Sequence, residues 1–297
     1  MLRGEAVAVE PAVRDALARE GLAGEDPIAR AKAALVLERD VRALAAALAD
    51  VDHAFFKGAL ADARWWGGRG LRGCTDIDVL VADGERAGVA LRALGYEVVE
   101  AGGRASAAAF KARNWRAADR LWVDVHVRLL NVPPFRVATD EVLASARTYD
   151  TAFGPLRGPS PEHLLVMGAG NLATGGMTGR LRLALDTACL LTREPLDLAL
   201  AAATARRWGA AAALWGLLRL VEARFDLSVP LDALAPPAPL RPLVERAFGV
   251  HAAPRRPRNR VAALIAVDWP LSGRPLWPAH AVARRLALAA GDRVSRG

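Results

Sequence analysis

Apolar residues recur at helical spacing along residues 27–50, where the chain's hydrophobic pattern first becomes regular. The apolar positions are Ile28, Ala31, Leu35, Leu37, Val41, Leu44, Ala45 and Leu48. Because residues three or four apart share one face of a helix, they predict a helix over 27–50. Short apolar runs then predict strands over 51–56, 76–82, 96–100 and 121–130. Helices are expected between them over 59–66 and 85–94, the second ending at Gly95.

After Pro155 the pattern becomes helical. Ser160 and Pro161 predict a helix start, with the serine as N-cap and the proline at the first helical position. Ala- and Leu-rich segments predict helices over 161–174, 178–193, 195–208 and 210–226, and a last helix near 279–290. Five prolines over 230–242 interrupt this series, and 251–260 resembles a Pro- and Arg-rich loop. We therefore expect an α+β fold, with a small mixed sheet in residues 1–154 and a mainly helical region in residues 155–297.

The composition, 53% apolar and 24% charged residues, is typical of a globular protein. Two cysteines lie far apart, so no disulfide framework is expected and a reducing compartment fits. The N-terminus lacks the apolar core of a signal peptide, and no apolar run approaches the roughly 20 residues of a membrane span. We therefore predict a cytoplasmic protein without a membrane partner.

The formal net charge is +8, and three of the 40 basic residues are lysines, which leaves 37 arginines. An Arg-rich surface suits phosphate or an acidic partner, although a codon bias that replaces lysine with arginine is the simpler explanation. The retained lysines Lys32, Lys57 and Lys111 are therefore candidates for a specific requirement.

Two carboxylates interrupt the predicted strand at 76–82. Asp76 and Asp78 alternate with apolar residues, so both side chains point to one face of the strand, about 7 Å apart. Two like charges repel each other there, and burial increases the cost. A divalent cation removes this repulsion, and Mg²⁺ prefers oxygen ligands of this kind. The alternative is a strand at a solvent-facing edge.

A third carboxylate lies in the predicted strand at 121–130. Val123, Val125 and Val127 would form one face, and Asp124 and His126 the other. With Asp124 beside the first pair, two ions roughly 3.5–4 Å apart would clamp the attacking and leaving oxygens of a phosphoryl displacement. An outward-facing Asp124 and a structural or supporting His126 are the simpler alternatives.

An ordered set of motifs resembles one bacterial family. Phe55-Phe56-Lys57-Gly58-Ala59 is followed by Arg72, by Asp76-Ile77-Asp78-Val79-Leu80-Val81, by Leu94-Gly95-Tyr96 and by Val123-Asp124-Val125-His126. This arrangement resembles the uncharacterised bacterial nucleotidyltransferases of the DNA polymerase beta-like superfamily. The resemblance covers roughly residues 35–130, with a looser match at Arg180-Leu181-Arg182-Leu183-Ala184-Leu185-Asp186.

The resemblance implies transfer of a nucleoside monophosphate from an NTP, with ATP expected, to a hydroxyl of a small molecule or peptide. Asp76, Asp78 and Asp124 would hold two Mg²⁺ ions, and Asp124 would also help to activate the acceptor as ligand or base. Lys57 and Arg72 would neutralise the triphosphate, and both have surface charge as the alternative. Residues 1–154 would form the catalytic domain, and residues 155–297 would lie on the acceptor side.

The phosphate loop departs from the family's usual pattern, which has Gly-Gly or Gly-Ser about ten residues before the first Asp. Here Ala59 follows Gly58, and 16 residues separate Ala59 from Asp76. Gly67-Gly68 is an alternative phosphate loop. We favour Gly58, because it follows an apolar strand and opens a possible helix whose amides would meet phosphate.

Other residues have weaker functional interpretations. Arg182 and Asp186 are four apart, so a helix ion pair is favoured and acceptor binding is the alternative. The Gly-rich segment 167–178 would be either a loop near the active cleft or part of a packed helix. Three tryptophans could stack a nucleobase, although packing is the commoner role, and these are Trp65, Trp66 and Trp115.

Two other functions remain open from the sequence. An RNA- or tRNA-modifying toxin of the same fold fits the charge of +8, but no compact array of basic and aromatic residues favours a nucleic-acid partner. A catalytically inactive scaffold subunit would fit Ala59, whereas the intact set of three aspartates argues against it. The sequence leaves the acceptor and the oligomeric state open.

Overall fold

The computed structural model describes residues 27–99, 112–129, 135–174, 180–230 and 232–250. These residues divide into two compact units, which we call the sheet unit and the helical unit. The described part of the sheet unit is 27–99, 112–129 and 138–160, and that of the helical unit is 135–137, 161–174, 180–230 and 232–250. The predicted helix near 279–290 and the loop at 251–260 lie outside the described residues.

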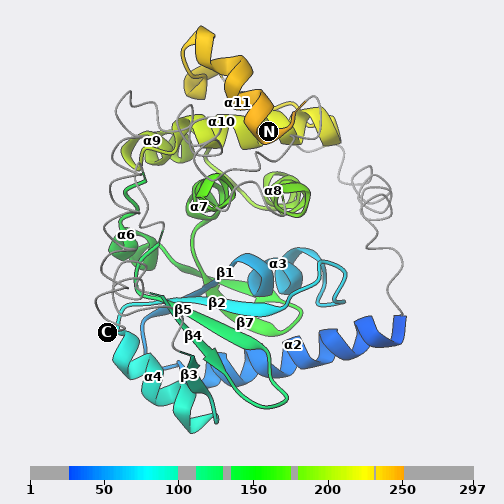
Figure 1. Ribbon diagram of the computed structural model, residues 1–297, viewed down its shortest axis with the longest axis vertical. Coiled ribbons are helices and arrows are strands. Elements are labelled where there is room, and N and C mark those ends of the chain that lie inside the picture. Colours follow the sequence, from blue (N-terminus) through cyan, green and yellow to red (C-terminus); the bar gives the residue numbers. More distant parts are fainter. Residues whose placement is uncertain (1–26, 100–111, 130–134, 175–179, 231, 251–297) are drawn as a thin grey trace, which may run out of the picture. The chain divides into compact units, whose positions relative to one another are not determined.

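The sheet unit contains a five-stranded mixed sheet with flanking helices (Figure 1). Its elements are α2 (Pro27–Ala47), β1 (His53–Phe56), α3 (Lys57–Trp65), β2 (Asp76–Val81), α4 (Gly84–Ala93), β3 (Glu97–Val99), β4 (Ala112–Arg116), β5 (Trp122–His126), α6 (Thr139–Ala144), β6 (Arg147–Thr151) and β7 (Gly154–Gly158). The strand order is β1-β2-β5-β4-β3. Strands β2 and β5 are parallel, and the other neighbouring pairs are antiparallel. The predicted α+β class and mixed sheet are therefore confirmed.

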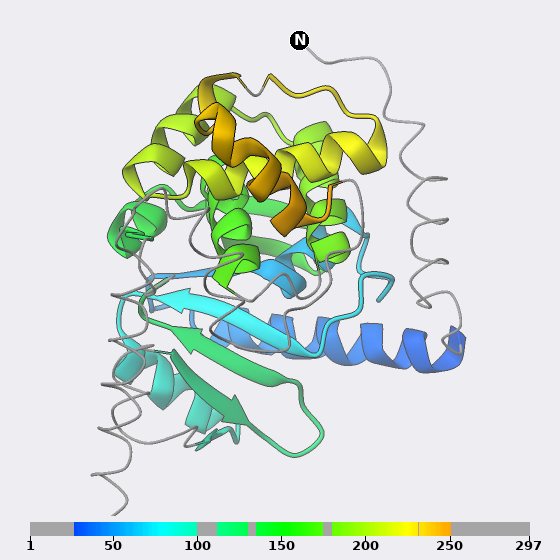
Figure 2. The same ribbon diagram turned by 45° about the horizontal axis from the view of Figure 1, so that its top comes forward.

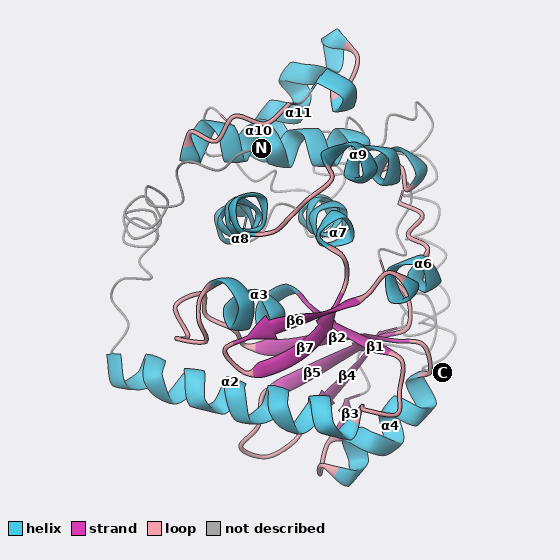
Figure 3. Cartoon of the chain, turned by 180° about the vertical axis from the view of Figure 1, so that it is seen from behind, coloured by secondary structure: helices cyan, strands magenta, loops and turns pink. Residues whose placement is uncertain are grey.

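One face of this sheet is apolar and packs against helices. Ile77 and Val79 of β2 and Val123 of β5 are each 0% exposed, and Trp115 of β4 lies directly opposite Val123. A Cβ at Gly88 of α4 would lie 3.2 Å from the Trp115 ring, so α4 packs closely on this face. Figure 3 shows α2 running along the sheet beside α4. The alternation of apolar and polar residues in β2 and β5 therefore leaves their aspartates on the other face.

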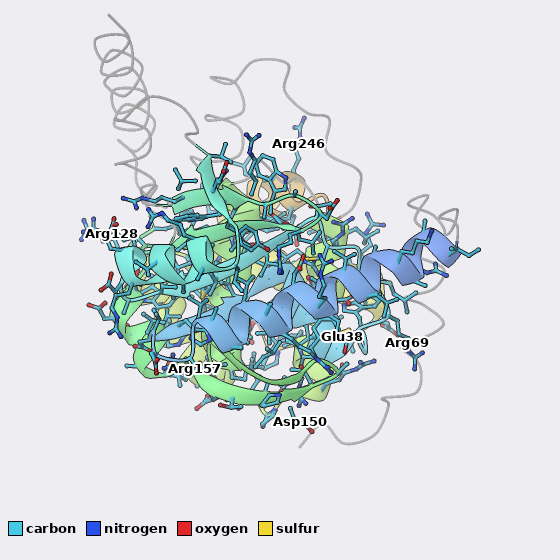
Figure 4. The ribbon with its side chains drawn as sticks, turned by 90° about the horizontal axis from the view of Figure 1, so that it is seen from below. Glu38, Arg69, Arg128, Asp150, Arg157 and Arg246 are labelled. Atoms are coloured by element: carbon cyan, nitrogen blue, oxygen red, sulfur yellow. The ribbon has the colours of Figure 1, made fainter. Side chains whose placement is uncertain are left out.

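The hairpin of β6 and β7 forms a separate two-stranded sheet beside β1. Arg157 of β7, labelled in Figure 4, donates hydrogen bonds to the carbonyls of His53 and Leu143, the second at 2.8 Å. It also pairs with Asp52. One guanidinium thus joins the hairpin to β1 and to α6. In the sheet unit, α6, β4, β6 and β7 were not predicted from the sequence.

The helical unit is built around α10. Its elements are α7 (Pro161–Thr174), α8 (Arg180–Arg193), α9 (Leu198–Arg207), α10 (Ala211–Phe225), η2 (Asp232–Leu234), η3 (Ala238–Leu240) and α11 (Arg241–Phe248). Leu214, Leu217 and Val221 of α10 are each 0% exposed. Figures 1 and 2 show α10 crossing α7 and α8 within this unit. The four predicted helices between 161 and 226 are confirmed.

The segment 167–178, predicted as either a loop or part of a helix, begins within α7. Helix α7 continues through Thr174, so the interpretation of 167–178 as a loop is wrong for its described part, and the helical alternative holds there. Residues 175–179 lie outside the described residues. Within the described residues, none of the helices is both long and apolar enough to cross a membrane.

Candidate active site

The register of the sheet brings two of the predicted aspartates side by side. In the parallel pairing of β2 with β5, Asp78 lies opposite Asp124. On the outer sides of this pair, Phe56 of β1 lies opposite Asp78 and Asn114 of β4 lies opposite Asp124. Neighbouring strands are about 4.8 Å apart, so the two carboxylates share one patch of the sheet face.

Asp78 is 3% exposed and is held by two side chains. Lys57 Nζ lies 2.5 Å from its Oδ1 and His126 Nε2 lies 2.9 Å from the same oxygen. Burial on its own raises the pKa of Asp78, but the hydrogen bond with His126 and the charge of Lys57 outweigh burial, so its pKa lies below the ordinary value. Asp78 is therefore an ionised carboxylate inside the protein. It is stabilised by a hydrogen bond with His126 and by the positive charge of Lys57.

Asp124 is half-buried and behaves in the opposite way. Burial raises its pKa above the ordinary value, and the negative charges of Asp78 and Asp76 add to this effect. One ligand atom each from Asp78, Asp124 and His126 lies within 4.8 Å of the others. Two carboxylates that repel each other beside an imidazole are a donor set that fits a divalent cation.

Asp76 lies on the same face as Asp78, two residues earlier on β2, and is half-buried. Its partner in β5 is Trp122, not Asp124. Asp76 is therefore outside the group formed by Asp78, Asp124 and His126, although its charge reaches Asp124. Its predicted role as a metal ligand stays a prediction.

Lys57 and Gly58 begin α3 directly after β1, where Phe56 is the N-cap. Lys57 has φ of 52°, a left-handed conformation that non-glycine residues rarely adopt. A Cβ at Gly58 would lie 2.8 Å from Cys74 Sγ and 2.9 Å from a terminal guanidinium nitrogen of Arg72. The guanidinium of Arg72 therefore lies against the first turn of α3, close to the amides that Gly58 would offer to a phosphate.

The Gly-rich loop after α3 is held in place by Asp62, which is 0% exposed. Its carboxylate accepts hydrogen bonds from the amides of Gly70 at 3.4 Å and Arg72 at 3.3 Å. The loop glycines with positive φ are Gly67, Gly68, Gly70 and Gly73. The loop thus holds the backbone of Arg72 in place. Since a Cβ at Gly68 would lie 2.6 Å from the Phe153 ring, Gly68 packs against the hairpin.

The predicted residues of the helical unit lie on α8. Asp186 is 5% exposed and Arg182 is half-buried. Their proposed part in acceptor binding stays a prediction.

The tryptophans of the sheet unit differ in how much of each side chain is exposed. Trp65, Trp66 and Trp115 are 7%, 8% and 0% exposed, so they pack in the core, as their commoner role suggested. Trp122 is 45% exposed and shares the face of Asp124, two residues away on β5. Trp122 was not among the site residues predicted from the sequence, although the alternation Trp122-Val123-Asp124-Val125-His126 already assigned it to the polar face.

A comparison with protein families gives the class to which the chain belongs. The chain belongs to the family described as uncharacterised nucleotidyltransferases, whose model matches residues 22–226. The match includes the whole five-stranded sheet and continues through α10. No curated protein matches the chain. The class of protein is thus a nucleotidyltransferase, as the ordered motifs predicted.

Proposed function

We propose that this protein is an Mg²⁺-dependent nucleotidyltransferase that moves a nucleoside monophosphate from ATP, or another NTP, to a hydroxyl of a small molecule or peptide. The observation that carries the proposal is the parallel register of β2 and β5. It sets the buried, ionised Asp78 beside Asp124 on one sheet face. Lys57 and Arg72 supply positive charge at the adjoining start of α3.

Asp78, Asp124 and Asp76 are the residues that would hold Mg²⁺, with His126 fixing Asp78 from the side. When bound, Mg²⁺ neutralises the charge that builds up on the phosphate oxygens during displacement. The carboxylate of Asp124 faces the acceptor hydroxyl and takes its proton. A carboxylate within reach of the acceptor hydroxyl can serve as its general base.

The proposed reaction is a single in-line displacement. The acceptor oxygen forms a bond to the α-phosphorus, and the bond from this phosphorus to the bridging oxygen of the β-phosphate breaks. Pyrophosphate leaves with the electron pair of that bond, while the acceptor proton passes to Asp124. Positioning and charge neutralisation supply most of the rate, because the protein makes no covalent bond.

Lys57 and Arg72 would bind the leaving pyrophosphate. The side chain of Lys57 is 35% exposed, so its ammonium can turn from Asp78 to a phosphate oxygen without unfolding any element. Arg72 is held against Gly58 by the loop that Asp62 supports. Ala59 offers no hydroxyl, so the phosphate contacts here would come from Arg72, Lys57 and the first amides of α3.

The test is release of pyrophosphate and transfer of label from α-³²P-ATP, with and without Mg²⁺, in the presence of a panel of hydroxyl acceptors. We expect Asp124→Asn to lower the rate by at least about 100-fold, because it removes a charge that acts on the transition state. Asp50→Asn is the matched control, since Asp50 is exposed in the turn between α2 and β1 and is not among the candidate site residues. Equal rates for wild type and Asp124→Asn would refute the proposed site.

A further inference from the structure

Trp122 is an exposed aromatic residue beside the candidate metal ligands. Its 45% exposure contrasts with Trp65, Trp66 and Trp115, which are all buried in the same unit. An indole left open to water forgoes the stabilisation that burial would give, about 25 cal/mol per Å² of apolar surface. Nearly half of the Trp122 side chain is therefore open to a ligand on this face of the sheet.

The register fixes the neighbours of Trp122. Along β5 it lies two residues from Asp124, and across to β2 it lies opposite Asp76. On the other side, β4 contributes Asn114, which lies opposite Asp124. Asn114 is half-buried, so the exposure of this face rises from Asn114 and Asp124 towards Trp122. Trp122 and Asn114 thus flank Asp124 from two directions.

The order of the strands puts the two sides of the candidate site on different strands. Lys57 and Gly58 follow β1, on one side of β2, whereas β5 and β4 lie on the other side of β2. In an in-line displacement the attacking and leaving oxygens lie on opposite sides of the phosphorus. If pyrophosphate leaves over Lys57, Gly58 and Arg72, the acceptor approaches over β5 and β4. Trp122 and Asn114 lie along that approach.

We propose that Trp122 and Asn114 form the acceptor subsite and select an acceptor whose hydroxyl is carried on or beside a ring, either a sugar or a phenol. This inference rests on the proposed function. The indole face stacks on a flat or apolar ring face, and the Asn114 amide both donates and accepts hydrogen bonds to a neighbouring polar group. Asp124 accepts the proton of the attacking hydroxyl, and the hydroxyl oxygen forms the new bond to the α-phosphorus. Pyrophosphate leaves with the electron pair of the bond that breaks.

The experiment compares acceptors with and without a ring in the same labelled ATP assay with Mg²⁺. The probes are methyl glucoside and N-acetyltyrosinamide as ring acceptors, and glycerol and N-acetylserinamide as ring-free acceptors. We expect wild type to label at least one ring acceptor about tenfold more efficiently than either ring-free acceptor, as one aromatic stack would give. The better ring acceptor distinguishes a sugar from a phenol.

Three variants test whether Trp122 causes the preference for ring acceptors. Trp122→Ala should remove the ratio of ring to ring-free labelling, and Trp122→Phe should keep most of it because the aromatic face remains. Val98→Ala is the control, since Val98 is 42% exposed on the same sheet but lies opposite the buried Trp115. Its ratio should equal that of wild type.

The outcomes separate this inference from the proposed function. A wild type that labels ring-free acceptors equally well, or a Trp122→Ala variant that keeps the full ratio, overturns the acceptor subsite while leaving nucleotidyl transfer intact. A wild type that labels none of the four probes overturns the ring-specific subsite. If it also releases no pyrophosphate from ATP, the proposed transfer itself is wrong.

Discussion

Two regions of the sheet unit each bury an aspartate, and the two side chains have different kinds of partner. Asp40 of α2 is 0% exposed and accepts a hydrogen bond from the amide of Leu121 at 2.8 Å. It also accepts hydrogen bonds from the side chains of Arg39 at 2.9 Å and Arg120 at 3.0 Å. Asp40 therefore ties α2 to the chain just before β5 by pairing with the backbone donor of Leu121.

Asp78 is 3% exposed, but its hydrogen-bond partners are the side chains of Lys57 and His126. Both partners can move without disturbing a backbone hydrogen bond. A buried carboxylate can have either of two roles. One that bonds the backbone belongs to the fold, and one held by side chains at a sheet face is available to a ligand.

The sharpest test of this comparison is Asp78→Asn. We expect the rate of nucleotidyl transfer to fall by about 1,000-fold, because one of the charges that would hold Mg²⁺ is removed. The free energy of unfolding should fall by only about 1–2 kcal/mol, since Lys57 is 35% exposed and can turn to water. Transfer kinetics and urea denaturation measure the two effects. A large loss of stability would place Asp78 with Asp40 instead.

The reciprocal change is Asp40→Ala. We expect it to lower the free energy of unfolding by about 3–5 kcal/mol, because Arg120 and the Leu121 amide lose a buried partner. The rate per folded molecule should stay within about threefold of wild type, as the site geometry is set by β2 and β5. Urea denaturation followed by circular dichroism measures the first effect. A folded but inactive variant would contradict the separation of roles.

Gly58→Ala tests the packing of Arg72 against the start of α3. The new methyl group would meet Cys74 Sγ and the Arg72 guanidinium, so we expect Arg72 to be displaced and KM for ATP to rise about tenfold. Gly168→Ala on α7 is the control, since its methyl group would meet the side chain of Leu183 at 3.3 Å. Its KM should match wild type. An unchanged KM in Gly58→Ala would remove Arg72 from the phosphate site.

The cysteine thiols test the packing around Gly58 without changing the sequence. Burial raises the pKa of Cys74 to about 12 and that of Cys189 to about 11. Because the thiolate is the reactive form, at most about one thiol in a thousand is ionised at pH 8. Ellman's reagent should therefore react at least about 100-fold more slowly with the native protein than with protein in guanidinium. Fast labelling of native Cys74 would mean that the packing around Gly58 is looser than the structure shows.

Most of the regular elements could be predicted from the sequence, because their apolar periodicity is strong. The helix at 27–47 and the strands with Asp78 and Asp124 fall where the pattern placed them. The β6–β7 hairpin was missed, because its strands mix polar residues and glycine, as in Gly154–Gly158. The fixing roles of Asp40 and Asp62 were also missed, since they depend on amides far along the chain or in an irregular loop.

By itself the sequence determined that Asp76 and Asp78 share one face of a strand and that Asp124 and His126 share one face of another, because side chains alternate in any β-strand. Only the tertiary structure decided which of them meet. The insertion of β5 between β2 and β4 sets Asp124 beside Asp78, brings His126 to the same carboxylate and leaves Asp76 opposite Trp122. Strand order and register depend on long-range pairing across the whole sheet, and no local pattern of apolar and polar residues encodes them.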